Sequence, residues 1–420
     1  MHTRTKNSAF TLIELLVVIA IIAILAVVVV LTLNPAEMMR EARDSNRLSD
    51  LATLNSALGA YEAQDGNALG APDTVYVSLP DPTLSGNQTS TCASLNLPAL
   101  PAGYTYQCSS PQDYRNASGT GWIPVNLASP AVSNILSSLP VDPTNQSSTR
   151  LYYTYTTNGT QYEITAPMES SKYQLGGSHD VIVNDGSPLT TVYAKGTNLT
   201  LEPLDYGDPS LVGYWPLDEG SGTVAYDGSG NGNNGNWSGT TSGTSGYYSP
   251  GLNGGWAGNF NTSNGITNSS PSSALTVNNF SISLWILPTA IPVGGWAGLV
   301  LKETGTWPSF YSISVDPTTG ATYGSIMANG GNRDSPGYDM VLGVWQFVTY
   351  VHNNTVGTDC FYENGALVGC SGQALTPDIG AGTFDIGGAN IGFTGLMNDI
   401  RIYNRALSSA EVMALYNAEK

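Results

Sequence analysis

The chain has 420 residues, too many for one small core, and this length predicts two or three domains. Charged residues make up only 11% of it, against roughly a quarter in an average soluble protein, while glycine is abundant with 48 residues. This composition is typical of an extracellular, β-rich protein with many polar turns. The formal net charge of -18 argues against nucleic-acid binding by the bulk of the protein, because the averaged field repels phosphate.

The first predicted element is an apolar helix from Phe10 to Leu33, interrupted only by Thr11, Glu14 and Thr32. A helix of this length measures about 36 Å, enough to cross a bilayer. The leader MHTRTKNSA before it is basic, so the positive-inside rule places it in the cytoplasm. The run is longer than a signal-peptide core, and no A-x-A cleavage site follows it. We therefore expect it to be retained as a transmembrane helix.

Glu14 is out of place in a membrane helix, where an ionised carboxylate costs at least about 2.5 kcal/mol. The motif AFTLIELLVVIAIIAIL around it resembles the N-terminal methylation segment of type IV pilins and type II secretion pseudopilins. The resemblance implies that a prepilin peptidase removes residues 1–9 by cutting between Ala9 and Phe10, and that Phe10 is then N-methylated. Those families usually have glycine before the cut, where this chain has Ala9.

Cleavage creates a new amino group on Phe10, and its charge also needs a partner. We expect Glu14 of a neighbouring subunit to supply it, which fixes the axial register of a filament more than it adds stability. The implied partners are further copies of this chain, the prepilin peptidase and methylase, the pilus assembly machinery, and the cytoplasmic (inner) membrane before assembly. The mature protein is then expected in an extracellular, cell-surface filament.

The helical pattern continues past the apolar run. Pro35 removes a backbone donor and predicts a kink. Apolar residues then recur at spacings of three and four, at Leu51, Leu54, Leu58 and Tyr61. Charged residues take the other faces, among them Arg43, Arg47 and Asp50. We therefore expect a helix over residues 10–64, with residues 10–33 in the membrane or filament core and the rest packed on a globular head, as in the spine of a pilin.

Residues 65–205 are predicted to form this head around an antiparallel β-sheet. Its clearest strands, RLYYTYTTNG and TQYEITAPM, meet at Asn158-Gly159, a strong hairpin signal. Three loop residues carry oxygen donors and are interpreted as solvated turn residues rather than calcium ligands: Asp142, Asn145 and Asp180. The composition shifts at NLTLEPLDYGDPS, which is interpreted as a linker.

Residues 206–420 alternate short strands with Gly/Asn/Ser turns, which predicts a β-sandwich. In FSISLWIL, Phe280 and the residues at even numbers after it fall on one face, and Trp285 lies on the other. The stretches GYWPLDEGSGTVAYDGSGNGNNG and GLMNDIRIYNRALSSAEVMALYN resemble the two ends of laminin-G-like, concanavalin-A-like jelly rolls. The fold class is thus an α+β pilin followed by an all-β jelly-roll sandwich. Ser408 and Glu411 form a capping box that starts a last helix.

The four cysteines form two local pairs, and a membrane segment ahead of them favours disulfides in an oxidising compartment. Cys92 and Cys108 are expected to staple a loop of the head. Cys360 and Cys370 flank the ENGALV hairpin, where register decides whether they meet. A three-residue loop places them directly opposite, whereas a two-residue loop at Asn364-Gly365 does not, and the pairing favours the longer loop.

Members of the jelly-roll family often hold a structural calcium, which makes Ca²⁺ a possible cofactor. The resemblance places the candidate ligands at Asp227, Asn231 and Asp399. Gly/Asn turns of this kind also occur without metal, so no cofactor is certain.

No catalytic site is expected. The chain has only three histidines and no GxSxG motif, and the neighbouring carboxylates Asp218 and Glu219 are expected to point to opposite faces of a strand. Exposed aromatic residues stack on sugar rings, and six candidates lie in or near loops: Trp215, Trp237, Trp256, Trp296, Trp307 and Tyr338.

The sequence therefore predicts a non-enzymatic subunit of a type IV pilus-like filament that displays a jelly roll for adhesion to a glycan or a surface protein. Two alternatives remain. One is a pseudopilin of a type II secretion or competence apparatus. The other is a membrane-anchored surface lectin that never polymerises, against which Glu14 and the cleavable leader argue.

Overall fold

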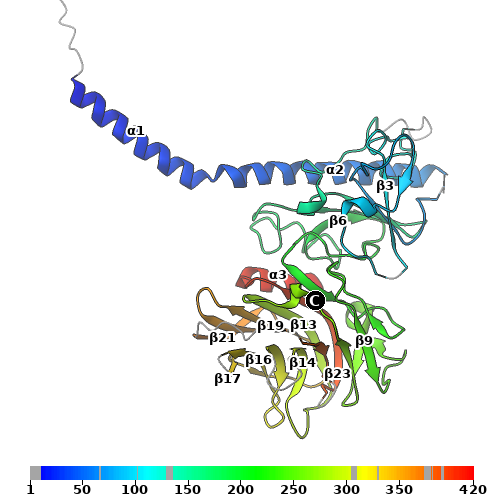
Figure 1. The fold of residues 1–420 in the computed structure, drawn as a ribbon, viewed down its shortest axis with the longest axis vertical. Coiled ribbons are helices and arrows are strands. Elements are labelled where there is room, and N and C mark those ends of the chain that lie inside the picture. Colours follow the sequence, from blue (N-terminus) through cyan, green and yellow to red (C-terminus); the bar gives the residue numbers. More distant parts are fainter. Residues whose placement is uncertain are drawn as a thin grey trace, which may run out of the picture.

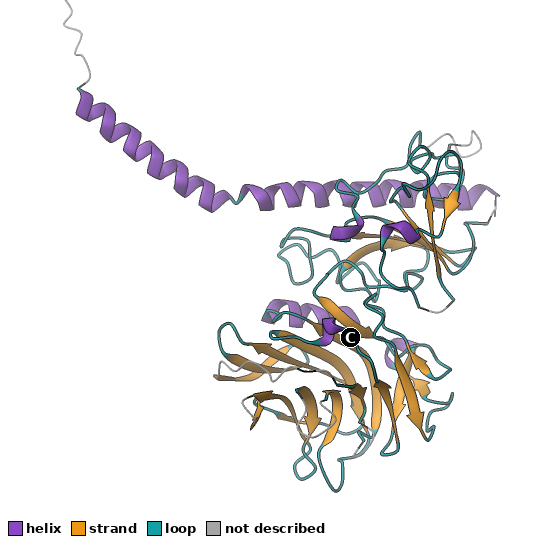
Figure 2. Cartoon of the chain, viewed as in Figure 1, coloured by secondary structure: helices purple, strands orange, loops and turns teal. Residues whose placement is uncertain are grey.

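The computed structural model describes residues 11–65, 68–101, 103–128, 136–303, 310–328, 331–372, 380, 382–388 and 392–420, with side chains except at 27–33, 64–65, 327–328 and 331–333. A long helical stalk leads into an α+β head, and an all-β sandwich follows (Figure 1). The helices, which include short 3-10 turns, are gathered in the stalk, beside the head sheet and on the sandwich (Figure 2).

The stalk consists of helix α1 (Leu12–Leu33) and helix α2 (Pro35–Asp65). Asn34 separates them in a left-handed conformation, with φ of 39°. Pro35 is the first residue of α2, a position where its missing N–H costs nothing. The predicted break at Pro35 is confirmed, and the bend is visible in Figure 1.

The described residues of the head form a six-stranded sheet in the order β2-β3-β1-β4-β5-β6. Its strands are β1 (Thr74–Val77), β2 (Thr89–Ser90), β3 (Thr105–Ser109), β4 (Thr154–Thr157), β5 (Tyr162–Pro167) and β6 (Val192–Gly196). The hairpin predicted at Asn158-Gly159 joins β4 to β5. The expected antiparallel sheet needs one correction, because β1 and β3 run parallel. Residues 78–104 between them are long enough for the crossover that a parallel pair requires.

The segment interpreted as a linker is instead part of the folded head. Leu204, Asp205 and Tyr206 are at most 1% exposed. The ring of Tyr206 stacks on Tyr152 with 5.0 Å between centroids, and its hydroxyl donates to the Tyr152 carbonyl over 3.0 Å. Asp205 accepts hydrogen bonds from the backbone of Thr190 at 2.9 Å. The head therefore continues to the first strand of the sandwich without a free connection.

The sandwich has two sheets. The described strands of the first are β7 (Leu211–Trp215), β10 (Tyr248–Pro250), β11 (Trp256–Phe260), β13 (Phe280–Pro288), β19 (Gln346–Asn353), β20 (Thr358–Glu363), β21 (Ala366–Gly372) and β23 (Gly395–Tyr403). Those of the second are β8 (Val224–Ala225), β9 (Gly235–Gly239), β12 (Asn264–Asn268), β14 (Ala297–Lys302), β15 (Tyr311–Val315), β16 (Ala321–Ala328), β17 (Gly331–Asp334), β18 (Tyr338–Asp339) and β22 (Phe384–Ile386).

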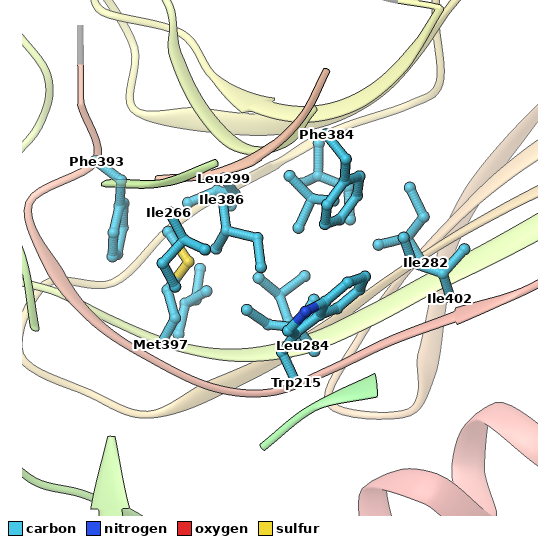
Figure 3. Packing of buried hydrophobic residues seen from close by; sticks show 14 of the residues in the cluster. Trp215, Ile266, Ile282, Leu284, Leu299, Phe384, Ile386, Phe393, Met397 and Ile402 are labelled. Atoms are coloured by element: carbon cyan, nitrogen blue, oxygen red, sulfur yellow. The ribbon is translucent and has the colours of Figure 1, made fainter. Parts of the chain in front are cut away.

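The predicted alternation in β13 is confirmed. Phe280, Ile282, Leu284 and Ile286 are fully buried in the core between the sheets. Figure 3 shows side chains of this core, including Ile282 and Leu284, around Trp215, whose ring stacks on Phe384 at 4.6 Å. The all-β sandwich thus has one continuous apolar centre.

Helix α3 (Ser409–Glu419) covers the outer face of the first sheet. It begins with the predicted capping box of Ser408 and Glu411. Its Tyr416 ring lies 5.7 Å from the ring of Trp285, the outward residue of β13. Figure 1 places this helix, and the C-terminus that follows it, on the side of the sandwich that faces the head.

Candidate functional site

The N-terminal processing site lies outside the described residues, which begin after Ala9 and Phe10. Glu14, the predicted assembly residue, is described and caps its own helix. Its Oε2 accepts from the backbone N–H of Thr11 at 2.8 Å and from the Thr11 hydroxyl at 2.7 Å. The Thr11 hydroxyl in turn accepts from the Glu14 backbone at 3.3 Å. Thr11-x-x-Glu14 is a capping box. The sequence carries this signal, but the prediction of Glu14 as an assembly residue did not include it.

The side chains of α1 point into open surroundings. Its large apolar residues between Leu12 and Leu25 are 45% to 81% exposed. In the part of the chain that the structure describes, no helix is both long enough and apolar enough to cross a membrane. The predicted transmembrane segment over residues 10–33 is therefore not confirmed.

Helix α2 is held to the head by a buried ionic cluster. Arg47 is fully buried, and its guanidinium forms ion pairs with Asp44, Asp142 and Glu169 at 2.6 to 2.7 Å. Although burial disfavours its charge, Asp142 and the other carboxylates raise the pKa of Arg47. The expectation that Asp142 is a solvated turn residue is wrong, because Asp142 and Arg47 neutralise each other inside the protein.

Both predicted disulfides are present, Cys92–Cys108 and Cys360–Cys370. The expected loop of the second hairpin is wrong, since β20 and β21 join through only two residues, Asn364 and Gly365, both with positive φ. A bulge next to Phe361 shifts the register by one residue and brings Cys360 opposite Cys370 after all.

The residues expected to hold calcium are placed around Tyr214. Asp227 accepts a hydrogen bond from the backbone N–H of Tyr214 at 3.0 Å. Asp399 accepts one from the Tyr214 hydroxyl at 2.8 Å, at the far end of the same side chain. Asn231 donates to the Leu211 carbonyl at 3.2 Å. Among the described residues, no group of three or more His, Cys, Asp or Glu side chains could hold a metal ion. Calcium at these positions stays a prediction.

A cavity of about 640 Å³ lies between the head and the sandwich. The head contributes residues around Tyr104, the turn at 186–189, and Glu202 from the former linker. The sandwich contributes the segment after β7, the turn before β11 and the middle of β23, and Glu419 closes the wall from the end of α3. The cavity exists only because both units pack together.

The wall of this cavity is acidic. Its charged residues among those described are Glu202, Asp218, Glu219, Asp399 and Glu419, with no lysine or arginine. Burial raises the pKa of Glu202 to about 7, even though the hydroxyls of Thr154 and Thr156 donate to its Oε2. Burial also raises the pKa of Glu219 to about 7. The site thus gathers carboxyl groups in a partly dehydrated space, where burial disfavours their charged forms.

Two of these acids have a built-in counterion. Arg401 of β23 is fully buried beneath the cavity, pairs with Glu419 and lies 3.5 Å from Asp399. Its guanidinium also stacks over the ring of Tyr214 at 4.1 Å. Burial raises the pKa of Glu419 to about 8, against the effect of Arg401.

Sequence reasoning missed this site for two reasons. Glu202 was assigned to a linker, although its flanks in TLEPL are apolar and indicate burial. Asp218 and Glu219 were expected on opposite faces of a strand, but β7 ends at Trp215 and the chain turns at Leu217, with φ of 60°. Both acids consequently line the same cavity.

The aromatic candidates divide between core and surface. Trp215 and Trp237 are buried in the sandwich core, and Tyr338 stacks on Phe361. Trp256 and Trp296 are more than one third exposed, and Trp256 lines the cavity. Trp307 lies outside the described residues.

Two family models match the chain. Residues 260–413 match the concanavalin A-like lectin/glucanases superfamily. The sandwich therefore resembles concanavalin A-like domains. Residues 4–30 match the prokaryotic N-terminal methylation motif. The chain therefore joins a pilin-type methylation motif to a concanavalin A-like domain, as its sequence predicted. A comparison with curated proteins gives no match.

Several solved structures resemble the chain at low identity. Domain 4 of AbnA, an extracellular arabinanase from Geobacillus stearothermophilus, is 21% identical with a TM-score of 0.39, over 49% of this chain and 98% of that one. The binding domain of botulinum neurotoxin DC is 15% identical with a TM-score of 0.39, over 50% of this chain and 52% of that one. The chain thus spans about half the length of that binding domain.

Proposed function

We propose that this protein is a structural, non-enzymatic subunit of a type IV pilus-like filament on the cell surface. The methylation motif at residues 4–30 carries the proposal. In this proposal the peptidase cuts between Ala9 and Phe10, and residues 10–33 hold the protein in the cytoplasmic membrane until assembly. The assembly machinery then adds it to the filament.

The stalk supports this proposal physically. Apolar side chains along α1 are exposed from Leu12 to Leu25. A contiguous apolar surface of this size needs a covering partner. A bilayer covers it before assembly, and the stalks of neighbouring copies cover it afterwards. The head and the concanavalin A-like domain are then carried outside the filament core, where the latter serves adhesion or glycan binding.

The decisive experiment separates the two roles of Glu14. Glu14→Gln keeps an oxygen acceptor for the capping box but removes the charge that pairs with the Phe10 amine. Thr11→Val removes the capping hydroxyl and keeps the charge. Cells that express the assembly machinery and each full-length variant are sheared, and the filament fraction is immunoblotted.

We expect Thr11→Val to give filaments and Glu14→Gln to accumulate in the membrane without them. Normal filaments from Glu14→Gln would sink the proposed contact. Mass spectrometry of the mature N-terminus should find methylated Phe10. Immunogold labelling of the sandwich then distinguishes a pilus from the pseudopilin alternative, which leaves no surface fibre.

A further inference from the structure

The cavity between head and sandwich has one carboxylate oxygen that the protein leaves without a partner. Glu202 is only 6% exposed, and its Oε2 accepts from the hydroxyls of Thr154 at 2.6 Å and Thr156 at 2.9 Å. Its Oε1 is shielded from solvent and accepts no hydrogen bond. Since buried acceptors are normally satisfied, this oxygen calls for a donor from outside the chain.

The sandwich offers a second unsatisfied oxygen across the same cavity. Glu219 Oε1 accepts from the backbone of Tyr226 at 2.8 Å, whereas its Oε2 is shielded and accepts no hydrogen bond. Asp218 lies beside it in sequence and also lines the cavity. In the described part of the chain these two acids and Glu202 form no ion pair, unlike Asp399 and Glu419, which Arg401 neutralises. Three acidic residues therefore line the cavity without a cation.

Aromatic surfaces complete the cavity. Trp256 is 37% exposed and lines it together with Tyr104 and Tyr226. The indole rests on Gly220, where an added Cβ would lie 2.5 Å from its Nε1, so a larger residue would displace it. Aromatic faces favour both sugar rings and cations, and unpaired carboxylates favour donors that carry positive charge.

We propose that this composite cavity binds the protonated amino group of an amino sugar, with Glu202 of the head and Glu219 of the sandwich as acceptors and Trp256 against the ring. The inference rests on the proposed display of the sandwich for glycan binding. It assigns recognition to the junction of the two units, so neither the head nor the sandwich alone holds the site. A metal ion is a poorer occupant, since the described residues provide no cluster of ligands for one.

The test compares two probes that differ only at their nitrogens, which are free amines in one and acetylated in the other. Glucosamine trisaccharide and its fully N-acetylated form are titrated calorimetrically into the full-length chain in detergent at neutral pH. We expect binding of the amino form and at least about ten-fold weaker binding of the acetylated form, because a charge-assisted hydrogen bond is lost.

Glu202→Gln should weaken binding of the amino form by about ten-fold or more and leave the acetylated form unchanged. Trp256→Ala should weaken binding of both sugars. Because Trp256 is partly exposed, this variant still tests the cavity if the buried variant Glu202→Gln misfolds. Asp339→Asn, an exposed acid on β18, is the matched control and should change nothing.

Equal affinity for the two sugars would overturn the amine assignment while leaving glycan binding by the displayed domain intact. Wild-type affinity in Glu202→Gln would overturn the role of the cavity. Binding of neither sugar would overturn the inference, and the filament assay of Glu14→Gln decides the proposed assembly role separately.

Discussion

Arg47 on α2 and Asp142 in the head form a two-pronged ion pair in which both side chains are fully shielded from solvent. The guanidinium Nε lies 2.6 Å from Oδ2, and Nη2 lies 2.9 Å from Oδ1. Asp44 and Glu169 both accept from Nη1 of the same arginine. Since 95 residues separate the partners in sequence, this contact fixes the orientation of the stalk against the head.

Arg47→Met should destabilise the head strongly, because it leaves buried carboxylates without their counterion. Loss of one partner of a buried pair costs about 3 to 5 kcal/mol. Denaturant unfolding of the full-length chain in detergent measures it. Arg40→Met is the control, since Arg40 is 52% exposed and its pair with Glu37 is worth at most about 1 kcal/mol. Equal midpoints for the two variants would contradict the assigned role.

Short-range chemistry explains what the sequence predicted correctly. The break at Pro35, the hairpin at Asn158-Gly159 and the capping box of Ser408 each depend on a few neighbouring residues. The disulfide of the sandwich was also predicted correctly, but from a loop length that the structure does not have. A bulge next to Phe361 shifts the register instead, and counting residues does not reveal it.

Long-range contacts account for what was missed. The burial of Arg47 was not predicted because its partner Asp142 lies far away in sequence. Glu202 looked like part of a linker because its burial depends on β4, through Thr154 and Thr156. The candidate site combines residues of the head and of the sandwich, and no local sequence pattern indicates that these residues lie close together.

Stability should fall as the pH rises from about 5 to 8.5. Burial raises the pKa of Glu163 to about 8 and that of Glu202 to about 7, both above the ordinary value near 4.5. The folded state therefore holds protons that the unfolded state has released, and each group's contribution is present below pH 4.5 and is lost as pH rises through its folded pKa. The slope reaches about 1.4 kcal/mol per pH unit for each group.

Glu163→Gln should flatten this pH dependence. Glu163 Oε2 accepts from the backbones of Leu201 and Glu202 at 2.8 Å, and an amide oxygen can accept the same bonds without a charge. Unfolding curves at pH 5 and 8.5 should show the variant more stable than the wild type only at the higher pH. A parallel shift at both values would rule out the ionisation of Glu163 as the cause.

Loss of the Cys360–Cys370 disulfide should destabilise the sandwich by about 3 kcal/mol, because the bond closes a loop across a sequence separation of 10 residues. The double variant Cys360→Ser/Cys370→Ser is compared with the wild type by urea unfolding under oxidising conditions. Reduction also opens Cys92–Cys108, so the control compares the reduced wild type with the reduced double variant, and these two should match. An unchanged midpoint in the oxidised double variant would show that the disulfide of this hairpin contributes nothing to global stability.

The joint between head and sandwich should resist proteolysis as a folded segment does. Residues around Glu202 are buried, and the units contact each other through Arg401, which donates to the Pro188 carbonyl at 3.3 Å, and Ala99, which donates to the Gly230 carbonyl at 3.1 Å. An endopeptidase that cuts before aspartate should therefore leave the bond between Leu204 and Asp205 intact in native conditions, because both residues are buried. Tyr206→Ala removes the ring that packs on the head, which costs roughly 3 to 5 kcal/mol, and should open the same bond to cleavage. Cleavage of the wild type at this bond without denaturant would mean that the two units move freely, and the cavity between them would then lose its fixed shape.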